Sequence, residues 1–126
     1  MNLFNSKKRI LIIDDQEANR TAFSGHVPDG FDVQTAPDGL QGLKLAMGHA
    51  PDLIFLDLEM PVMDGFKFLA AARQQPKLAD VPIIILTGHN EMVSFDKAAS
   101  LGATDFIGKN VVNAQTIQDK IGKFLK

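Results

Sequence analysis

One segment decides the fold of this chain: Asp52-Leu53-Ile54-Phe55-Leu56-Asp57-Leu58-Glu59-Met60-Pro61-Val62-Met63-Asp64-Gly65. The apolar run from Leu53 to Leu56 has no polar face, which is typical of a strand covered on both sides in a parallel sheet between helix layers. Pro61 and Gly65 then indicate a turn, because proline cannot continue a strand ladder and glycine adopts conformations that other residues avoid. Asp57 is therefore expected at the carboxyl end of a buried strand, where such sheets carry their ligand sites.

The composition suits a single small domain. A length of 126 residues is enough for one buried core. The formal net charge of -2, from 13 basic and 15 acidic residues, gives no footprint for nucleic acid or a membrane surface. The absence of cysteine excludes disulfides and thiolate metal sites. Because no run approaches the roughly 18 apolar residues of a membrane span, we expect a cytoplasmic protein without membrane insertion or direct nucleic-acid binding.

Four other short apolar runs resemble the strand before Asp57. They begin at Ile10, Phe31, Ile83 and Asp105, and segments with apolar residues at helical spacing lie between them. A chain that alternates strand and helix about every two dozen residues predicts an α/β fold with a parallel sheet. The expected helices run from Gln16 to about Ser24, from about Leu40 to Gly48, from Gly65 to about Gln75, over Val93 to Leu101, and from about Asn113 onward.

Five polar side chains are expected where these strands end. Asp14 and Asp15 follow the first strand, Asp57 and Thr87 end the third and fourth, and Lys109 follows the fifth. Right-handed crossovers bring the carboxyl ends of parallel strands to one edge of the sheet, so these side chains should lie together. Each also has an ordinary structural interpretation when taken alone: Asp57 as a loop cap, Asp15 as a helix cap, Thr87 as a strand end and Lys109 as a surface residue.

The three acids predict a metal site. Carboxylates packed at one edge repel each other and raise one another's pKa unless a cation is present. An all-oxygen cluster without His or Cys suits Mg²⁺. We assign Asp14 and Asp15 to the metal, with Asp57 and the backbone carbonyl of Glu59 completing the protein ligands.

The same cluster predicts phosphoryl chemistry. A carboxylate beside Mg²⁺ is a competent nucleophile on phosphorus, so Asp57 is the candidate phosphoacceptor. Phosphoryl transfer requires mainly positioning and neutralisation of charge on the equatorial oxygens. The ammonium group of Lys109 and the hydroxyl of Thr87 can provide these interactions.

These motifs resemble the receiver domains of two-component response regulators, from about Arg9 to the end of the chain. The resemblance rests on Ile-Asp-Asp at 13–15, Leu-Asp-Leu-Glu-Met-Pro-Val-Met-Asp-Gly at 56–65, Leu-Thr-Gly at 86–88 and Gly-Ala-Thr-Asp-Phe-Ile-Gly-Lys at 102–109. It implies a flavodoxin-like doubly wound fold, with five parallel strands in the order 2-1-3-4-5 and helices on both faces. It further implies a single chemotaxis-type receiver domain over residues 1–126 without an output domain.

The resemblance also implies a signalling mechanism. A phosphohistidine of a histidine kinase or phosphotransfer protein would donate to Asp57, with Mg²⁺, Thr87 and Lys109 in the roles above. Phe106 occupies the place of the family's switch aromatic, whose ring turns inward when Thr87 moves toward the phosphoryl group; the alternative is an ordinary core residue. A downstream protein would bind the face formed by the fourth helix, fifth strand and fifth helix. The chain would be a monomer or a weak phosphorylation-dependent dimer, and would turn over no external substrate.

The chain departs from the family pattern after the lysine. Asn110 follows Lys109 where family members usually have a proline in a cis peptide. A cis bond without proline costs about 2.5 to 4 kcal/mol, so we expect this peptide to be trans, which leaves the loop and the placement of Lys109 open. Gly88 replaces the commoner alanine and predicts a roomier loop.

Glu59 and His89 lie two places after Asp57 and Thr87, respectively. Both side chains are therefore expected to flank the entrance to the site. The corresponding places in the family look like determinants of aspartyl phosphate hydrolysis. We expect Glu59 and His89 to tune the lifetime of the phosphorylated form.

Two other functions use the same residues. In a haloacid-dehalogenase-like phosphatase, Asp57 would be the nucleophile of a Mg²⁺-dependent hydrolase, but such enzymes need a second acid that Glu59 matches only in part. The other alternative is a receiver-like docking module that is not phosphorylated, which the Asn110 departure makes conceivable. The intact acids and Lys109 favour the phosphoreceiver.

Overall fold

A computed structural model describes residues 7–88 and 92–125 of the chain. In these residues five parallel strands form one sheet with the order β2-β1-β3-β4-β5, as predicted. The strands are β1 (Arg9–Ile13), β2 (Asp32–Ala36), β3 (Leu53–Asp57), β4 (Ile83–Thr87) and β5 (Asp105–Gly108).

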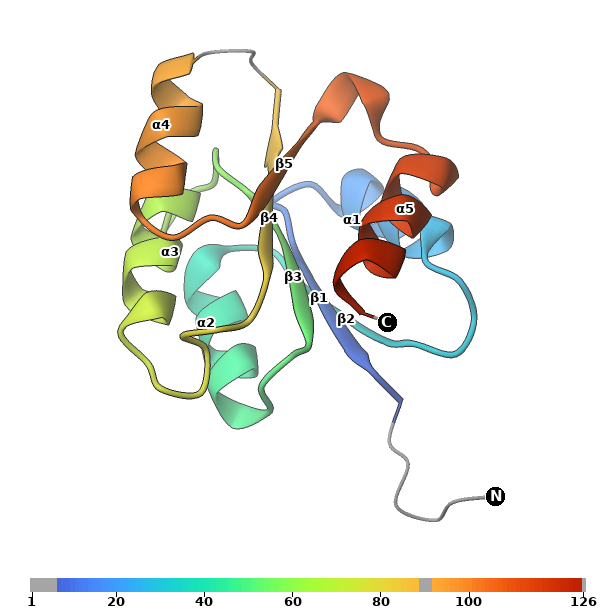
Figure 1. Ribbon diagram of the computed structural model, residues 1–126, viewed down its shortest axis with the longest axis horizontal. Helices are drawn as coiled ribbons and strands as arrows, with labels where there is room; N and C mark the ends of the chain where they lie inside the picture. Colours follow the sequence, from blue (N-terminus) through green and yellow to red (C-terminus); the bar gives the residue numbers. More distant parts are fainter. Residues whose placement is uncertain (1–6, 89–91, 126) are drawn as a thin grey trace.

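Helices cover both faces of the sheet. Figure 1 shows α2, α3 and α4 on one face and α1 and α5 on the other, confirming the doubly wound arrangement. The helices are α1 (Glu17–His26), α2 (Gly39–Gly48), α3 (Gly65–Arg73), α4 (Met92–Ser100) and α5 (Ala114–Phe124), and a short 3-10 helix, η1 (Lys109–Val111), precedes α5.

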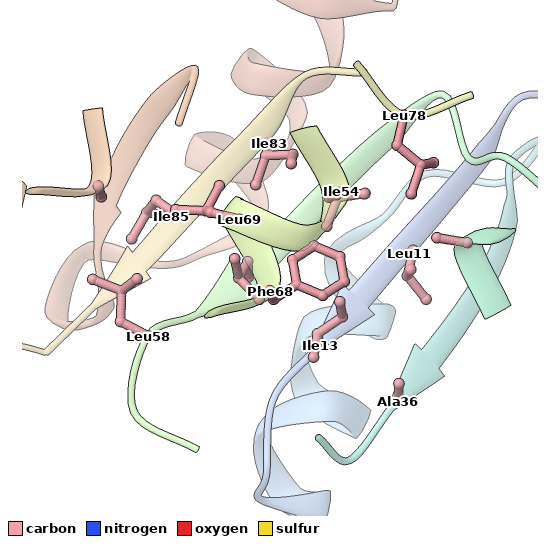
Figure 2. Close-up of a cluster of buried hydrophobic side chains, with 14 residues drawn as sticks. Leu11, Ile13, Ala36, Ile54, Leu58, Phe68, Leu69, Leu78, Ile83 and Ile85 are labelled. Carbon is pink, nitrogen blue, oxygen red and sulfur yellow. The ribbon is translucent and has the colours of Figure 1, made fainter. Parts of the chain in front are cut away.

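The central strand β3 is buried along its whole length, as its unbroken apolar run predicts. It pairs with β1 on one side and β4 on the other. On one face, Phe68 of α3 packs between Ile13 and Ile54 (Figure 2). On the other face the rings of Phe23 and Phe55 have centroids 4.8 Å apart. Burial on both faces fixes β3, and with it the position of Asp57 at its end.

Gly65 brings the start of α3 against the end of β3. A Cβ atom at this position would lie 2.7 Å from both the Asp57 carbonyl oxygen and the Leu58 Cα atom, distances that a side chain cannot tolerate. Its backbone φ is not positive, so the expectation of an unusual turn conformation at Gly65 was wrong. Asp64 caps α3 by accepting a hydrogen bond from the amide of Lys67 at 2.9 Å.

Arg73, at the end of α3, connects two loops on this face. Its guanidinium donates hydrogen bonds to the carbonyl oxygens of Leu78 at 2.7 Å, Val81 at 2.8 Å and Gly102 at 2.8 and 3.0 Å. Arg73 therefore holds the connections before β4 and β5, the two strands that carry Thr87 and Lys109 to the site.

Val62 carries backbone strain in the loop between β3 and α3. Its φ of 68° lies in the left-handed region, and its side chain is 75% exposed. The amide of Met63 donates to the carbonyl of Pro61 at 2.8 Å, which closes a γ-turn around Val62. A β-branched residue is disfavoured in this region because its side chain clashes with its own backbone.

Replacing Val62 by glycine is expected to raise the free energy of unfolding by about 1 kcal/mol. Glycine adopts a positive φ without strain, and the exposed valine contributes little buried area. Urea denaturation measures the change. As a matched control, Val111→Gly removes a half-exposed valine from η1, where φ is not positive, and should destabilise the fold. A comparable loss of stability at both positions would contradict the assignment of strain to Val62.

Candidate functional site

The carboxyl ends of the strands bring the predicted acids together. One carboxylate oxygen from each of Asp14, Asp15 and Asp57 lies within 4.8 Å of the others. Lys109, which directly follows β5, reaches the same cluster, with its Nζ 3.1 Å from Asp57 Oδ1 and 4.0 Å from Asp14 Oδ2. Residues nearly 100 positions apart thus form one charged site.

Asp57 is the most enclosed member of the site, with 2% of its surface exposed. Its Oδ1 accepts hydrogen bonds from Lys109 Nζ and, at 3.1 Å, from the amide of Glu59. Its Oδ2 is buried, and no hydrogen-bond donor among the described residues reaches it. A buried carboxylate oxygen without a donor is costly. Oδ2 therefore has lone pairs available to bind a cation or to form a bond to phosphorus.

Asp14 is nearly as buried, and its carboxylate is held by hydrogen bonds from residues at the start of α1. Its Oδ1 accepts a hydrogen bond from the amide of Gln16 at 2.9 Å, and the Asn19 amide lies 3.4 Å from both carboxylate oxygens. Asp15 is exposed, and among the described residues no side chain caps α1, whose N-cap residue is Gln16. The alternative interpretation of Asp15 as a helix cap was therefore wrong.

Thr87 and Glu59 lie next to Asp57 at the end of β3. With Phe66 they line a small pocket of about 50 Å³ that reaches the phosphoacceptor candidate. Thr87 is 5% exposed and ends β4 beside β5, paired in register with Gly108. His89 lies outside the described residues. The structure therefore places Thr87 and Glu59 beside Asp57.

A second cavity, of about 190 Å³, opens between α1 and the segment after β5. Asp14, Asn19 and Lys109 form part of its polar wall, and Phe23 and Val112 form part of its apolar wall. Sequence reasoning missed Asn19 as a neighbour of the acids. The available signal was its place in the first turns of a helix that begins directly after Asp14 and Asp15.

The Lys109–Asn110 turn does not displace the lysine. No cis peptide occurs in the described ranges, which confirms the expectation of a trans bond here. Residues 109–111 form η1, and Asn113 then caps α5 through reciprocal hydrogen bonds with Thr116 at 3.0 and 2.9 Å. With this trans peptide the Lys109 Nζ lies 3.1 Å from Asp57 Oδ1.

Gly88 is not required by packing. A Cβ atom at this position would lie 3.8 Å from Lys109 Cδ, an ordinary contact. The alanine that is commoner in the family would therefore fit here.

Phe106 is half-buried against the core beneath α3 and α4. It also borders an open pocket of about 340 Å³ with Lys120 and Lys123 of α5. Both lysines pair with Asp105, the residue before Phe106. The ring lies between core and surface, where a change of rotamer would alter both.

Burial raises the pKa of Asp57 from its ordinary value of 3.8 to about 6. The Lys109 ammonium and the Glu59 amide oppose this rise, and the negative charge of Asp14 adds a smaller increase. From the sequence we predicted a raised pKa caused by repulsion between carboxylates, but desolvation of Asp57 is the larger cause.

Without a bound metal, Asp57→Asn is expected to stabilise the protein at pH 7 by about 1 to 3 kcal/mol. A carboxyl group whose pKa is raised by folding stabilises the fold fully below its unfolded pKa, and this contribution is lost as the pH rises through about 6. Urea unfolding in a chelator at about pH 4.5 and about pH 7.5, which lie on either side of the folded pKa of about 6, measures it. The advantage of the variant should shrink at the lower pH, and parallel pH responses of both proteins would contradict the expectation.

Comparison with known proteins identifies this arrangement. Residues 10–121 match the response regulator receiver domain. The DNA-binding dual master transcriptional regulator RpaA of Synechocystis is 39% identical over 102 residues, which cover 80% of this chain and 42% of RpaA. The chain thus spans less than half the length of that relative.

Two solved structures extend the match. The chemotaxis protein CheY4 of Vibrio cholerae superposes with a TM-score of 0.89 and 31% identity, covering 95% of this chain and 100% of CheY4. The receiver domain of a Pseudomonas aeruginosa sensor histidine kinase, solved with a magnesium ion in its active-site cleft, has a TM-score of 0.86 and 25% identity over 94% of this chain and 98% of that domain. None of the helices in the described ranges has the length and apolar character needed to cross a bilayer.

A buried acid ends the central strand, and two further acids and a lysine meet it there. The match over residues 10–121 explains this arrangement. This chain belongs to the response regulator receiver domains, the phosphoacceptors of two-component signal transduction.

Proposed function

We propose that Asp57 is the phosphoacceptor of this receiver and that a phosphohistidine on a histidine kinase or phosphotransfer protein is its donor. The observation that carries this proposal is the buried Asp57 Oδ2, which lacks a donor among the described residues while Oδ1 is held by Lys109 and by the Glu59 amide. The contacts of Oδ1 fix the orientation of the carboxylate, and Oδ2 remains available to attack phosphorus.

In the proposed reaction, an Asp57 carboxylate oxygen forms a bond to phosphorus as the phosphorus–nitrogen bond of phosphohistidine breaks. The electron pair of the broken bond stays on the imidazole nitrogen. Lys109 neutralises charge on the transferring group, and the Thr87 hydroxyl donates a hydrogen bond to a phosphoryl oxygen. Later attack of water on phosphorus breaks the bond to Asp57, releasing inorganic phosphate and restoring the carboxylate.

Mg²⁺ fits the acids of this site. Asp14, Asp15, Asp57 and the Glu59 carbonyl would hold it, and their all-oxygen set suits a small hard cation. When bound, the ion neutralises negative charge on the phosphoryl oxygens. The P. aeruginosa receiver solved with magnesium in its cleft supports the same assignment.

The signal would leave through a binding surface. We place that surface on α4, β5 and α5, with Thr87 and Phe106 as the switch that couples it to Asp57. Residues 1–126 would act as one cytoplasmic receiver domain, as a monomer or a weak phosphorylation-dependent dimer. The chain would assist its own phosphorylation and dephosphorylation without turning over an external substrate.

Incubation with phosphoramidate or acetyl phosphate and Mg²⁺, followed by intact mass spectrometry, tests the proposal. One added phosphoryl group is the expected result. An unmodified protein would support the docking-module alternative, and steady release of phosphate from a small ester would support the phosphatase alternative. The open Oδ2 and the contact of Lys109 with Asp57 favour the phosphoreceiver over the docking module, and the partial match of Glu59 to a second acid disfavours the phosphatase.

Replacing Glu59 and His89 together by alanine is expected to change the dephosphorylation half-life without preventing phosphorylation. Glu59 lines the pocket beside Asp57, so its side chain can influence the approach of the hydrolytic water. Loss of the phosphoryl group over time, followed by intact mass, measures the half-life in the wild type and the double variant. An unchanged half-life would remove both residues from the set that tunes the signal.

A further inference from the structure

Arg20 contacts the acid cluster through the backbone. Its Nη1 donates a hydrogen bond of 2.7 Å to the carbonyl oxygen of Asp14. This carbonyl belongs to the peptide group that joins Asp14 to Asp15, the two acids of the cluster that lie outside any strand or helix. The guanidinium therefore restrains the orientation of the peptide between two candidate metal ligands.

The two acids depend on this restraint to different degrees. The Asp14 carboxylate is held independently by the Gln16 amide and by Asn19. The amide of Asp14 is also fixed, since it donates to the Ala36 carbonyl at 3.1 Å. Asp15 is exposed in the short connection before α1. Rotation of the intervening peptide would thus move the Asp15 carboxylate while leaving that of Asp14 largely in place.

We propose that Arg20 is a positioning residue for the divalent cation site, acting through the Asp14–Asp15 peptide to keep the Asp15 carboxylate directed at the cluster. The inference rests on the proposed Mg²⁺ site and assigns a residue that supports it. Side chains that orient metal ligands without touching the metal commonly change metal affinity by about 10- to 100-fold when removed.

The helix that carries Arg20 is well placed for this role. The Arg20 amide donates to the Gln16 carbonyl at 3.0 Å, and the Ser24 hydroxyl donates to the Arg20 carbonyl at 2.8 Å. Its side chain is only partly exposed, and the planar guanidinium offers several donors in a rigid geometry. The Arg20 backbone is therefore fixed in α1, and its side chain reaches back to the strand end.

The test measures Mg²⁺ affinity of the unphosphorylated protein by isothermal titration calorimetry. Arg20→Met removes the donor and keeps an unbranched apolar stem, and it should weaken Mg²⁺ binding about tenfold or more. Arg20→Lys keeps the charge on a shorter side chain, and it should still weaken binding by about fivefold. Arg9→Met is the matched control, because Arg9 starts β1 at the opposite edge of the sheet and pairs with Asp32 there. Its Mg²⁺ affinity should equal that of the wild type.

The outcomes separate this inference from the proposed function. Failure of the wild type to bind Mg²⁺ would overturn the metal assignment itself. Wild-type affinity in Arg20→Met, or in Arg20→Lys, would overturn the positioning role while leaving the Mg²⁺ site intact. An equal loss in Arg9→Met would show that general charge is responsible and would also overturn it. Circular dichroism confirms folding, and if Arg20→Met is unfolded, the affinity of Arg20→Lys decides the question.

Discussion

Asp57→Asn is expected to abolish the uptake of a phosphoryl group from acetyl phosphate or phosphoramidate in the presence of Mg²⁺. Asparagine keeps the shape of the side chain but replaces a nucleophilic carboxylate oxygen by an amide, so no aspartyl phosphate can form. Intact mass spectrometry after incubation should show one phosphoryl group on the wild type and none on the variant. The expected effect is complete loss, since Asp14 and Asp15 would serve the metal.

A nearby acid provides the matched control. Asp64 lies in the same connection between β3 and α3, where it caps the helix through its contact with the Lys67 amide. Asparagine is also a good helix cap, so Asp64→Asn should fold normally and accept the phosphoryl group like the wild type. Phosphorylation of Asp57→Asn to the wild-type level would show that another residue is the phosphoacceptor.

Arg73→Met is expected to lower the free energy of unfolding by about 3 kcal/mol. The substitution keeps an apolar stem but removes the donors from the carbonyl groups of Leu78, Val81 and Gly102. Hydrogen bonds to charged groups contribute about 1.5 to 3 kcal/mol each, although neighbouring bonds from one side chain do not add fully. Urea denaturation at pH 7 measures the loss.

The same helix supplies the control for Arg73. Lys67 is exposed on α3. Lys67→Met also replaces a positively charged side chain by methionine, but on the solvent-exposed face of the helix. Its effect should stay within about 0.5 kcal/mol, as for most surface substitutions. A similar loss for both variants would mean that charge on α3, rather than the loop contacts of Arg73, stabilises the fold.

Much of the fold could be predicted because its signals are local. The unbroken run from Leu53 to Leu56 requires burial on two faces, and the alternation of such runs with helical segments leads to a parallel sheet. Asp14, Asp15, Asp57, Thr87 and Lys109 could be grouped for the same reason, since strand ends in a parallel sheet share an edge.

Other features depend on contacts between distant residues. The reason for Gly65 is the approach of α3 to the end of β3, which no turn pattern reveals. The carbonyl partners of Arg73 come from two separate loops, and the strain at Val62 is a backbone angle that its residue type argues against. Such features follow from how packed elements meet, so a linear pattern does not contain them.

The sequence by itself determined the alternation of strands and helices, the edge at which the acids gather and the family to which the chain belongs. Only the tertiary structure decided which oxygen of Asp57 is open, that the Gln16 amide holds the Asp14 carboxylate, and that Arg20 donates to the peptide between Asp14 and Asp15. The physical reason is distance. Hydropathy and turn propensities act over a few neighbouring residues, whereas the direction of a hydrogen bond is set where several elements pack together.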